Sequence, residues 1–141
     1  MGVRISATDW IEEKTSWDVN ASIELSKALE ALGAAYIHVS SAGLHIAQKI
    51  DIKPSYQVPF AAAIKPQVQI PVITVGLITN AEQAEEILQK DQADAIAIAR
   101  AILYDPHWPW HAAAQLKQEL KISPQYLRSA PHGLNGLFKP F

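Results

Sequence analysis

Short runs of apolar residues recur along the chain, and they predict β-strands. Three of the runs contain no charge, at residues 36–39, 71–75 and 95–98, and a fourth at residues 3–6 includes Arg4. Apolar and polar positions do not alternate within these runs, which is typical of strands buried on both faces, as in a parallel sheet. The pattern therefore predicts a parallel sheet built from these four runs.

Apolar residues recur at helical spacing between the strands. The stripes are Ile23, Leu25, Ala28, Leu29 and Leu32; Ala84, Ile87 and Leu88; and Ala113, Leu116 and Leu120. Gly33 follows the first stripe and suits the left-handed turn that ends many helices. Asn80 and Gln83 have the spacing of a capping box, which predicts a helix start. Pro109 is suited to the first turn of the last helix.

Strands and helices therefore alternate, which predicts βαβ units with right-handed crossovers. Two architectures satisfy this order: an open doubly wound sheet, or part of a (β/α)8 barrel. No G-x-G-x-x-G motif follows the first strand, which counts against a dinucleotide-binding open sheet. A complete barrel needs about 250 residues and eight units. Four units would be half of one.

The region after Leu120 has a different composition. Ser123 and Pro124 end the helical pattern, and residues 131–141 contain proline and glycine without periodicity. We predict one domain over residues 1–122 and an extended tail over residues 123–141, which is either mobile or ordered by a partner.

Composition narrows the classes of function. The chain has 141 residues, 49% of them hydrophobic and 18% charged, which excludes disorder as the main state. A net charge of −2 provides no basic field for nucleic acid or an anionic membrane. The absence of cysteine excludes disulfides and thiolate metal sites. No apolar stretch reaches the roughly 20 residues of a membrane helix, and no secretory signal is visible, so we expect a soluble, cytoplasmic protein.

Ligands of parallel α/β folds bind at the carboxyl ends of the strands. Small or polar residues at these predicted ends are Ser6, Ser40, Ser41, Gly43 and Thr74. Gly76, Ala99 and Arg100 also lie there, and they predict a cofactor-phosphate site. Small residues let backbone N–H groups approach an oxyanion, and Arg100 adds a fixed charge at a helix start. The alternative is a glycine required by a turn and an arginine paired with Asp94 or Asp105.

Arg4 and the histidines are further candidates. A charge in an apolar strand is costly unless it is paired or faces a ligand, so Arg4 faces an anion or polar ring or pairs with Asp9. We interpret His38, within a strand, as an interior, hydrogen-bonded residue. His107 and His111 are four residues apart, but the helix start predicted at Pro109 breaks their register, so no metal site is predicted.

An ordered series of motifs extends from about Val3 to Arg128. The motifs are Arg4–Ala7 (RISA), Val39–Leu44 (VSSAGL), Ala47–Ile50 (AQKI), Tyr56–Ala61 (YQVPFA), Val75–Thr79 (VGLIT), Gln83–Leu88 (QAEEIL) and Arg100–Pro106 (RAILYDP). Together they resemble the old yellow enzyme family, most closely its bacterial, thermophilic-like NADPH dehydrogenase branch. Such a series is far more specific than any single motif.

The resemblance implies an α/β fold that is the second half, four βα units, of an FMN-binding (β/α)8 TIM barrel. It also implies an FMN-dependent oxidoreductase that oxidises NADH or NADPH and passes hydride to a small enone-type acceptor. Arg4 matches the arginine that lies against the flavin ring. Gly76, Ala99 and Arg100 match the segments around the FMN phosphate, where the family usually has glycine in place of Ala99. Arg128 matches an arginine that reaches into a neighbouring subunit.

The family's substrate-binding pair, proton-donating tyrosine and flavin-tuning cysteine belong to the first half of its barrel. We therefore assign no catalytic residue here. A half-barrel leaves strand edges unpaired and, we expect, an apolar face uncovered, and both favour association. The expected partner is the N-terminal half-barrel or a second copy. The alternatives are a non-catalytic remnant or half-barrel module that needs a partner, and an unrelated phosphate-binding α/β protein.

Overall fold

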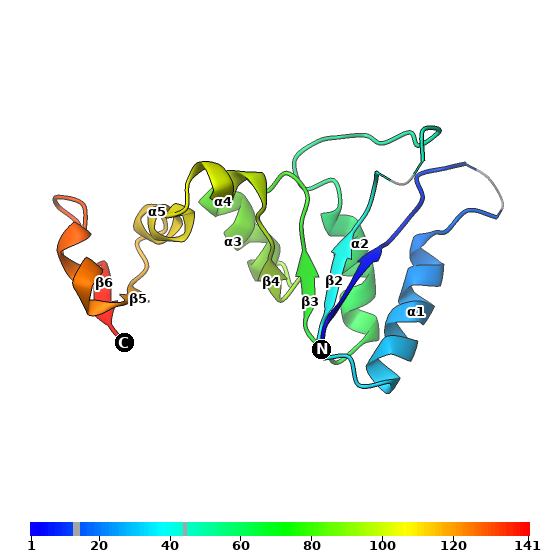
Figure 1. Cartoon of the computed structure of the whole chain (residues 1–141), viewed down its shortest axis with the longest axis horizontal. Helices are drawn as coiled ribbons and strands as arrows, with labels where there is room; N and C mark the ends of the chain where they lie inside the picture. The colour runs from blue at the N-terminus through cyan, green and yellow to red at the C-terminus, as the bar shows by residue number, and fades with distance from the viewer. Residues whose placement is uncertain (13–14, 44) are drawn as a thin grey trace. The chain divides into compact units, whose positions relative to one another are not determined.

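The computed structural model describes residues 1–12, 15–43 and 45–141, and within these ranges the chain divides into two compact units. The first unit comprises residues 1–79 and 84–98, and the second comprises residues 80–83 and 99–141. Each unit has its own sheet (Figure 1). Leu44, the last residue of one family motif, lies outside the described residues.

The first unit is built on the sheet that the apolar runs predict. Its strands β1 (Val3–Ser6), β2 (Ile37–Ser40), β3 (Val72–Thr74) and β4 (Ala95–Ile96) lie side by side in chain order. Each neighbouring pair is parallel. Parallel neighbours require a crossover between them, and here the crossovers carry helices. The predicted α/β class with alternating βα units is therefore confirmed.

The first helix, α1 (Val19–Ala31), ends where Gly33 predicts and begins at a cap that the sequence pattern did not identify. The carboxylate of Asp18 accepts a hydrogen bond from the helix's first turn. Gly33 has a φ of +87°, and its N–H donates to the Glu30 carbonyl at 2.8 Å. The next N–H donates to the Leu29 carbonyl at 3.0 Å. These two bonds form a Schellman closure, which needs the left-handed conformation that glycine adopts easily.

The helices after β2 and β3 differ in how well the sequence locates them. Helix α3 (Ala81–Gln89) begins as predicted, because Asn80 Oδ1 accepts from the Gln83 N–H at 2.8 Å. Helix α2 (Val58–Ile64), continued by the 3-10 helix η1 (Lys65–Gln67), is not located by periodicity. Its seven residues are too few to show an apolar stripe.

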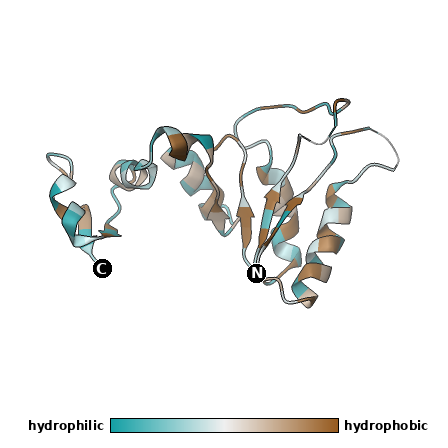
Figure 2. Ribbon diagram, viewed as in Figure 1, coloured by the Kyte–Doolittle hydropathy of each residue, from teal (hydrophilic) through white to brown (hydrophobic). Residues whose placement is uncertain are grey.

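One face of the first sheet is covered. Successive side chains of a strand point to opposite faces. The covered face carries Ile5, Ile37, Val39, Val72 and Thr74, each exposed by 7% or less. Along these strands Figure 2 shows hydrophobic residues together with hydrophilic ones. Helices α1 and α2 pack against each other, and the Ser22 hydroxyl of α1 donates to the Ala7 carbonyl at 2.9 Å, which ties α1 to the end of β1.

The opposite face, which we term the open face, is polar near β1 and β2. Register places Arg4 beside His38 and Ser6 beside Ser40. Arg4 is exposed and His38 is half-buried. The expectation of burial on both faces is therefore wrong for β1 and β2, and the apolar uncovered face that was expected is polar along these two strands, although the same face carries Ile73 on β3. A guanidinium and an imidazole lose hydration when they are buried without partners, so they favour a face that stays accessible.

The second unit contains short elements. They are α4 (Arg100–Tyr104), α5 (Trp108–Gln115), β5 (Leu120–Ile122), the 3-10 helix η2 (Pro124–Ser129) and β6 (Phe138–Pro140). Strands β5 and β6 form a parallel pair. In the part of the chain that the structure describes, no helix has both the length and the apolar character needed to cross a bilayer.

The second unit departs from the sequence prediction in two ways. The helix expected to reach Leu120 ends at Gln115, because Lys117 adopts a φ of +55° and the next N–H donates to the Ala113 carbonyl at 2.9 Å. This is a helix closure without the glycine that normally signals it. The tail predicted as extended instead carries η2 and β6, and its Phe138 and Leu137 are buried against Ile122. Burial of these apolar side chains orders the segment.

Candidate functional site

Arg4 lies within β1 on the open face. Its Nη2 donates to Ser40 Oγ, on the neighbouring strand, at 2.9 Å. Asp9, the alternative partner, instead accepts from the Trp17 backbone N–H at 2.8 Å. No ion pair recorded between described residues includes Arg4. A guanidinium has five N–H donors, and the bond to Ser40 uses one of them.

A buried glutamine is hydrogen-bonded to Ser40, the residue that accepts from Arg4. Gln57 directly precedes α2 and is 4% exposed. Its Oε1 accepts from Ser40 Oγ at 3.2 Å and from Ser41 Oγ at 3.0 Å. A hydroxyl has one proton, so donation to Gln57 leaves the Ser40 lone pairs to accept from Arg4. We term these four side chains the Arg4 network.

Gly76 borders the Arg4 network. It is buried and has a φ of +126°, a conformation that side-chain-bearing residues rarely adopt. A Cβ at this position would lie 3.0 Å from Gln57 Cβ and 3.1 Å from Gln57 Nε2. The chain bends at Gly76, and its carbonyl accepts from the distant Ser55 N–H at 3.0 Å. Glycine is therefore needed here for conformation and for space; its phosphate role stays a prediction.

A depression of about 320 Å³ opens where β1 and β2 end. It is lined by Arg4, Ile5, Ser6, Ser40, Ser41 and Ala42. The three serines were predicted as candidate ligand contacts because they lie at the ends of predicted strands. The lining combines a fixed cation with hydroxyl groups, so it suits a ligand that carries negative charge or hydrogen-bond acceptors.

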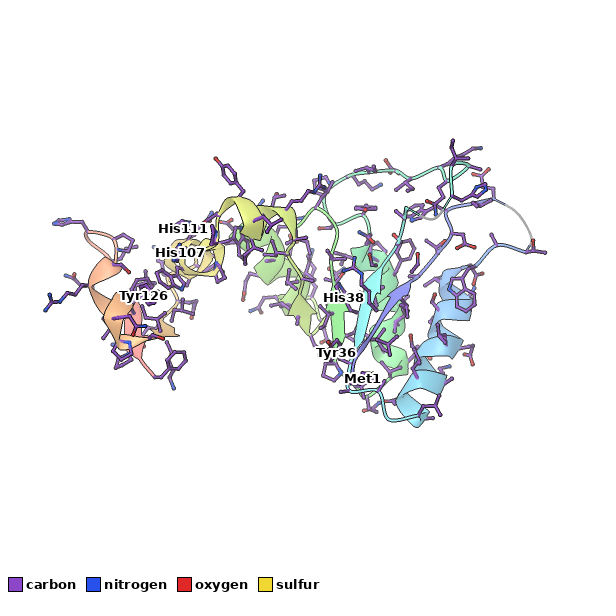
Figure 3. All side chains as sticks on the ribbon, viewed as in Figure 1. Met1, Tyr36, His38, His107, His111 and Tyr126 are labelled. Carbon is purple, nitrogen blue, oxygen red and sulfur yellow. The ribbon has the colours of Figure 1, made fainter. Side chains whose placement is uncertain are left out.

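Register places His38, which is labelled in Figure 3, on the open face beside Arg4. Burial, together with the positive charge of Arg4, lowers the pKa of His38 below its usual value of 6.5. Its Nε2 is buried and has no hydrogen-bond partner among the described residues, so the predicted hydrogen-bonded interior histidine is wrong for this nitrogen. The ring is therefore held in its neutral form at pH 7.

Ala99 and Arg100 belong to the second unit, whereas Gly76 belongs to the first. Helix α4 begins at Arg100, as predicted, and Ala99 has a φ of −109° and a ψ of −85°, so it does not adopt the left-handed conformation that would require glycine. The carboxylates considered as partners for Arg100 have other partners: Asp94 pairs with Lys65 at 2.5 Å and Asp105 with His111 at 2.7 Å. Both Ala99 and Arg100 are exposed.

Arg128 lies in η2 and is exposed. The ring of Tyr126, a residue of the same segment that is labelled in Figure 3, packs edge-on to Trp110 of α5 with 5.5 Å between centroids. The ring of His107 also lies against Trp110, with centroids 4.4 Å apart. A grouping of three or more potential metal ligands is not found among the described residues.

The chain was then compared with known proteins. The model of the NADH:flavin oxidoreductase / NADH oxidase family matches residues 1–119, most of the chain. The chain belongs to this family. The resemblance to the old yellow enzyme family is thereby confirmed. The four parallel strands β1 to β4, together with the helices that alternate with them, are part of that family's (β/α)8 barrel.

Curated relatives point to the same branch. The chain is 41% identical over 126 residues to an NADPH dehydrogenase of Geobacillus sp. (strain WCH70) and 42% identical over 127 residues to one of Bacillus licheniformis. The matches cover 89% and 90% of this chain but 36% and 37% of the relatives, so the chain spans about a third of their length. The carboxyl transferase domain of Rhizobium etli pyruvate carboxylase aligns over 67% of the chain with a TM-score of 0.42 and 20% identity, which is too remote to inform the assignment.

Proposed function

We propose that this chain forms the flavin-binding part of an FMN-dependent oxidoreductase that oxidises NADPH. The observation that carries the proposal is Arg4, held on the open face of the family's sheet beside a polar depression. A cation without a recorded carboxylate partner among the described residues fits a cofactor whose ring becomes negatively charged on reduction.

FMN, when bound, would supply the hydride chemistry of the family. In this chain Arg4 would bind the polar edge of the flavin ring and stabilise negative charge there. Ser40 already holds the guanidinium at 2.9 Å, so little reorganisation is needed when the ligand arrives. His38 beside it stays neutral, which avoids a second positive charge on the open face.

The residues that match the family's FMN-phosphate segments are Gly76 in the first unit and Ala99 with Arg100 in the second, and each of these two segments is proposed by itself as a phosphate contact. Glycine at position 76 leaves its backbone without a side chain, and the negative φ of Ala99 is compatible with a backbone N–H that donates to an oxyanion. Arg100 has no ion pair recorded among the described residues, so the N–H groups of its guanidinium are available to bind a phosphate.

The remaining parts of the barrel would come from elsewhere. β1 and β4 each have one strand neighbour among the described residues, and the open face is accessible. We propose that an N-terminal half-barrel or a second copy completes the ring, and that Arg128 reaches a neighbouring subunit. The acceptor class would be a small enone, as the family resemblance implies.

The chain matches only about a third of the length of its relatives, and this favours a second candidate function. A chain that spans about a third of an NADPH dehydrogenase is also expected if it is a non-catalytic module that acts only with a partner. This candidate shares the fold and the Arg4 network but does not require turnover.

FMN titration tests the proposal. The full chain, alone and mixed with the N-terminal part of one of its relatives, is titrated into FMN while flavin fluorescence is followed. We expect binding, weakened about tenfold or more in Arg4→Met and Arg100→Met, because each loses a charge-assisted hydrogen bond. The matched control is Lys121→Met, an exposed cation on β5.

The proposal would be contradicted if FMN bound neither to the chain alone nor to its mixture with the N-terminal part of a relative. Binding of FMN without its reduction by NADPH in the mixed sample would favour the non-catalytic module. Equal weakening by Lys121→Met would show that the affinity comes from overall charge and not from the assigned arginines.

A further inference from the structure

We propose that Ser40 and Gln57 are positioning residues for Arg4: they direct the guanidinium across β2 on the open face, and Gly76 provides the space that keeps Gln57 in place. This inference rests on the proposed function for the identity of the ligand. The positioning itself is a property of the chain without any ligand.

The direction of each hydrogen bond supports this role. Gln57 Oε1 accepts from two hydroxyls, so its carbonyl oxygen has both lone pairs engaged. The Ser40 hydroxyl therefore donates its single proton to Gln57, and only its lone pairs remain to accept hydrogen bonds on the open face. A lone pair attracts a guanidinium N–H, and the 2.9 Å bond from Arg4 Nη2 is the result.

Burial makes the arrangement rigid. Ser40, Ser41 and Gln57 are exposed by 9%, 7% and 4%, so their polar groups depend on one another for hydrogen bonds. Breaking one bond would leave a buried donor or acceptor unpaired, which is energetically unfavourable. Arg4, by contrast, is exposed and would sample many rotamers without its bond to Ser40.

Gly76 limits where the Gln57 side chain can go. Gln57 Cβ, Cγ and Nε2 all lie between 3.0 and 3.2 Å from the position of a Cβ on residue 76. A larger residue would push the amide out of its place and disturb the bonds to both serines. Gly76 therefore affects Arg4 from the end of β3, through Gln57 and Ser40.

The two serines provide a matched pair for the test. Each donates to the same Gln57 oxygen and each is buried, but only Ser40 is recorded as accepting from Arg4. Ser40→Ala and Ser41→Ala therefore remove comparable hydroxyls with different predicted effects on Arg4. Gln57→Met, which removes the acceptor and keeps the length of the side chain, is a second way to release Ser40.

The readout is the titration of the His38 ring, followed by NMR on the full chain without flavin and assigned with His38→Asn. Burial and, after it, the Arg4 charge lower the pKa of its register neighbour His38, so the change in that pKa on removing or releasing Arg4 reports where the guanidinium is. We expect Arg4→Met to raise the pKa of His38 most. Ser40→Ala and Gln57→Met should raise it partway, and Ser41→Ala should raise it clearly less than Ser40→Ala.

Two results would overturn the inference: an unchanged His38 pKa in Ser40→Ala when Arg4→Met raises it, or equal shifts in Ser40→Ala and Ser41→Ala. An unchanged pKa in Arg4→Met would overturn it as well, because the guanidinium would then not lie beside His38. FMN titration of the same variants is the separate test of the ligand. We expect Ser40→Ala to weaken FMN about threefold to tenfold and Ser41→Ala less.

The two tests fail independently. A chain that shows the predicted order of His38 shifts but binds no FMN keeps the positioning role and loses the proposed function. A chain that binds FMN through Arg4 while Ser40→Ala moves neither readout keeps the function and loses the positioning role.

Discussion

The two faces of the first sheet come from the same strands but have opposite chemistry. On the covered face, Ile37, Val39 and Val72 are completely buried and contribute through apolar area. On the open face, Arg4 and His38 are adjacent in register, and a buried network of serines and glutamine holds the arginine. Alternating residues of one strand therefore serve stability on one side and form the proposed ligand site on the other.

The largest effect expected from this comparison is on stability. Ile37→Ala should lower the free energy of unfolding by about 2–5 kcal/mol, because it leaves a cavity in a fully buried site. Ile73→Ala, on the open face and half-buried, is the matched control and should cost clearly less. Urea unfolding of the full chain measures both.

Equal losses for the two isoleucines would show that the open face is covered in solution. That outcome would remove the contrast between the faces and would point to an occupant of the open face even without added partner.

A smaller effect is expected at the end of β3. Gly76→Ala should destabilise the chain by about 1–3 kcal/mol, because it combines a positive φ with close approach to Gln57. Gly43→Ala is the control: its φ of +83° is also unfavourable, but no atom lies within 4 Å of the added Cβ. The difference between the two free energies of unfolding isolates the steric part. No difference would show that Gln57 moves aside freely.

The smallest effect is a pH dependence contributed by the open face. Burial and Arg4 lower the pKa of His38 in the folded chain, so below 6.5 the unfolded chain binds more protons. Stability should therefore fall as the pH decreases from 6.5 toward the folded pKa, and this contribution should be absent above 6.5. Unfolding free energies measured from pH 8 to pH 5 should show a slope that His38→Asn reduces. An unchanged slope in His38→Asn would contradict the assignment.

Much of the fold could be predicted from sequence because its signals are local. Asn80 and Gln83 mark the start of α3, and Gly33 marks the end of α1, through contacts within a few residues. The end of α5 could not be predicted, because Lys117 takes the left-handed conformation that glycine would have signalled. The pairing of β5 with β6 depends on apolar residues far apart in the chain, so periodicity does not show it.

The site was predicted in part. Arg4 was identified because a charge inside an apolar strand needs a reason, and the alternative pairing with Asp9 is not what the structure records. Gln57 was quoted only as part of a family motif. Nothing near it in sequence indicates that it accepts from Ser40, which lies 17 residues away.

The sequence by itself determined the family, the order of strands and helices, and the places where strands end, because motifs, apolar runs and helix caps act over short distances. Only the tertiary structure decided which face of the sheet is covered and which group orients Arg4. Those outcomes depend on which alternating side chains meet the helices and on hydrogen bonds between segments distant in the chain.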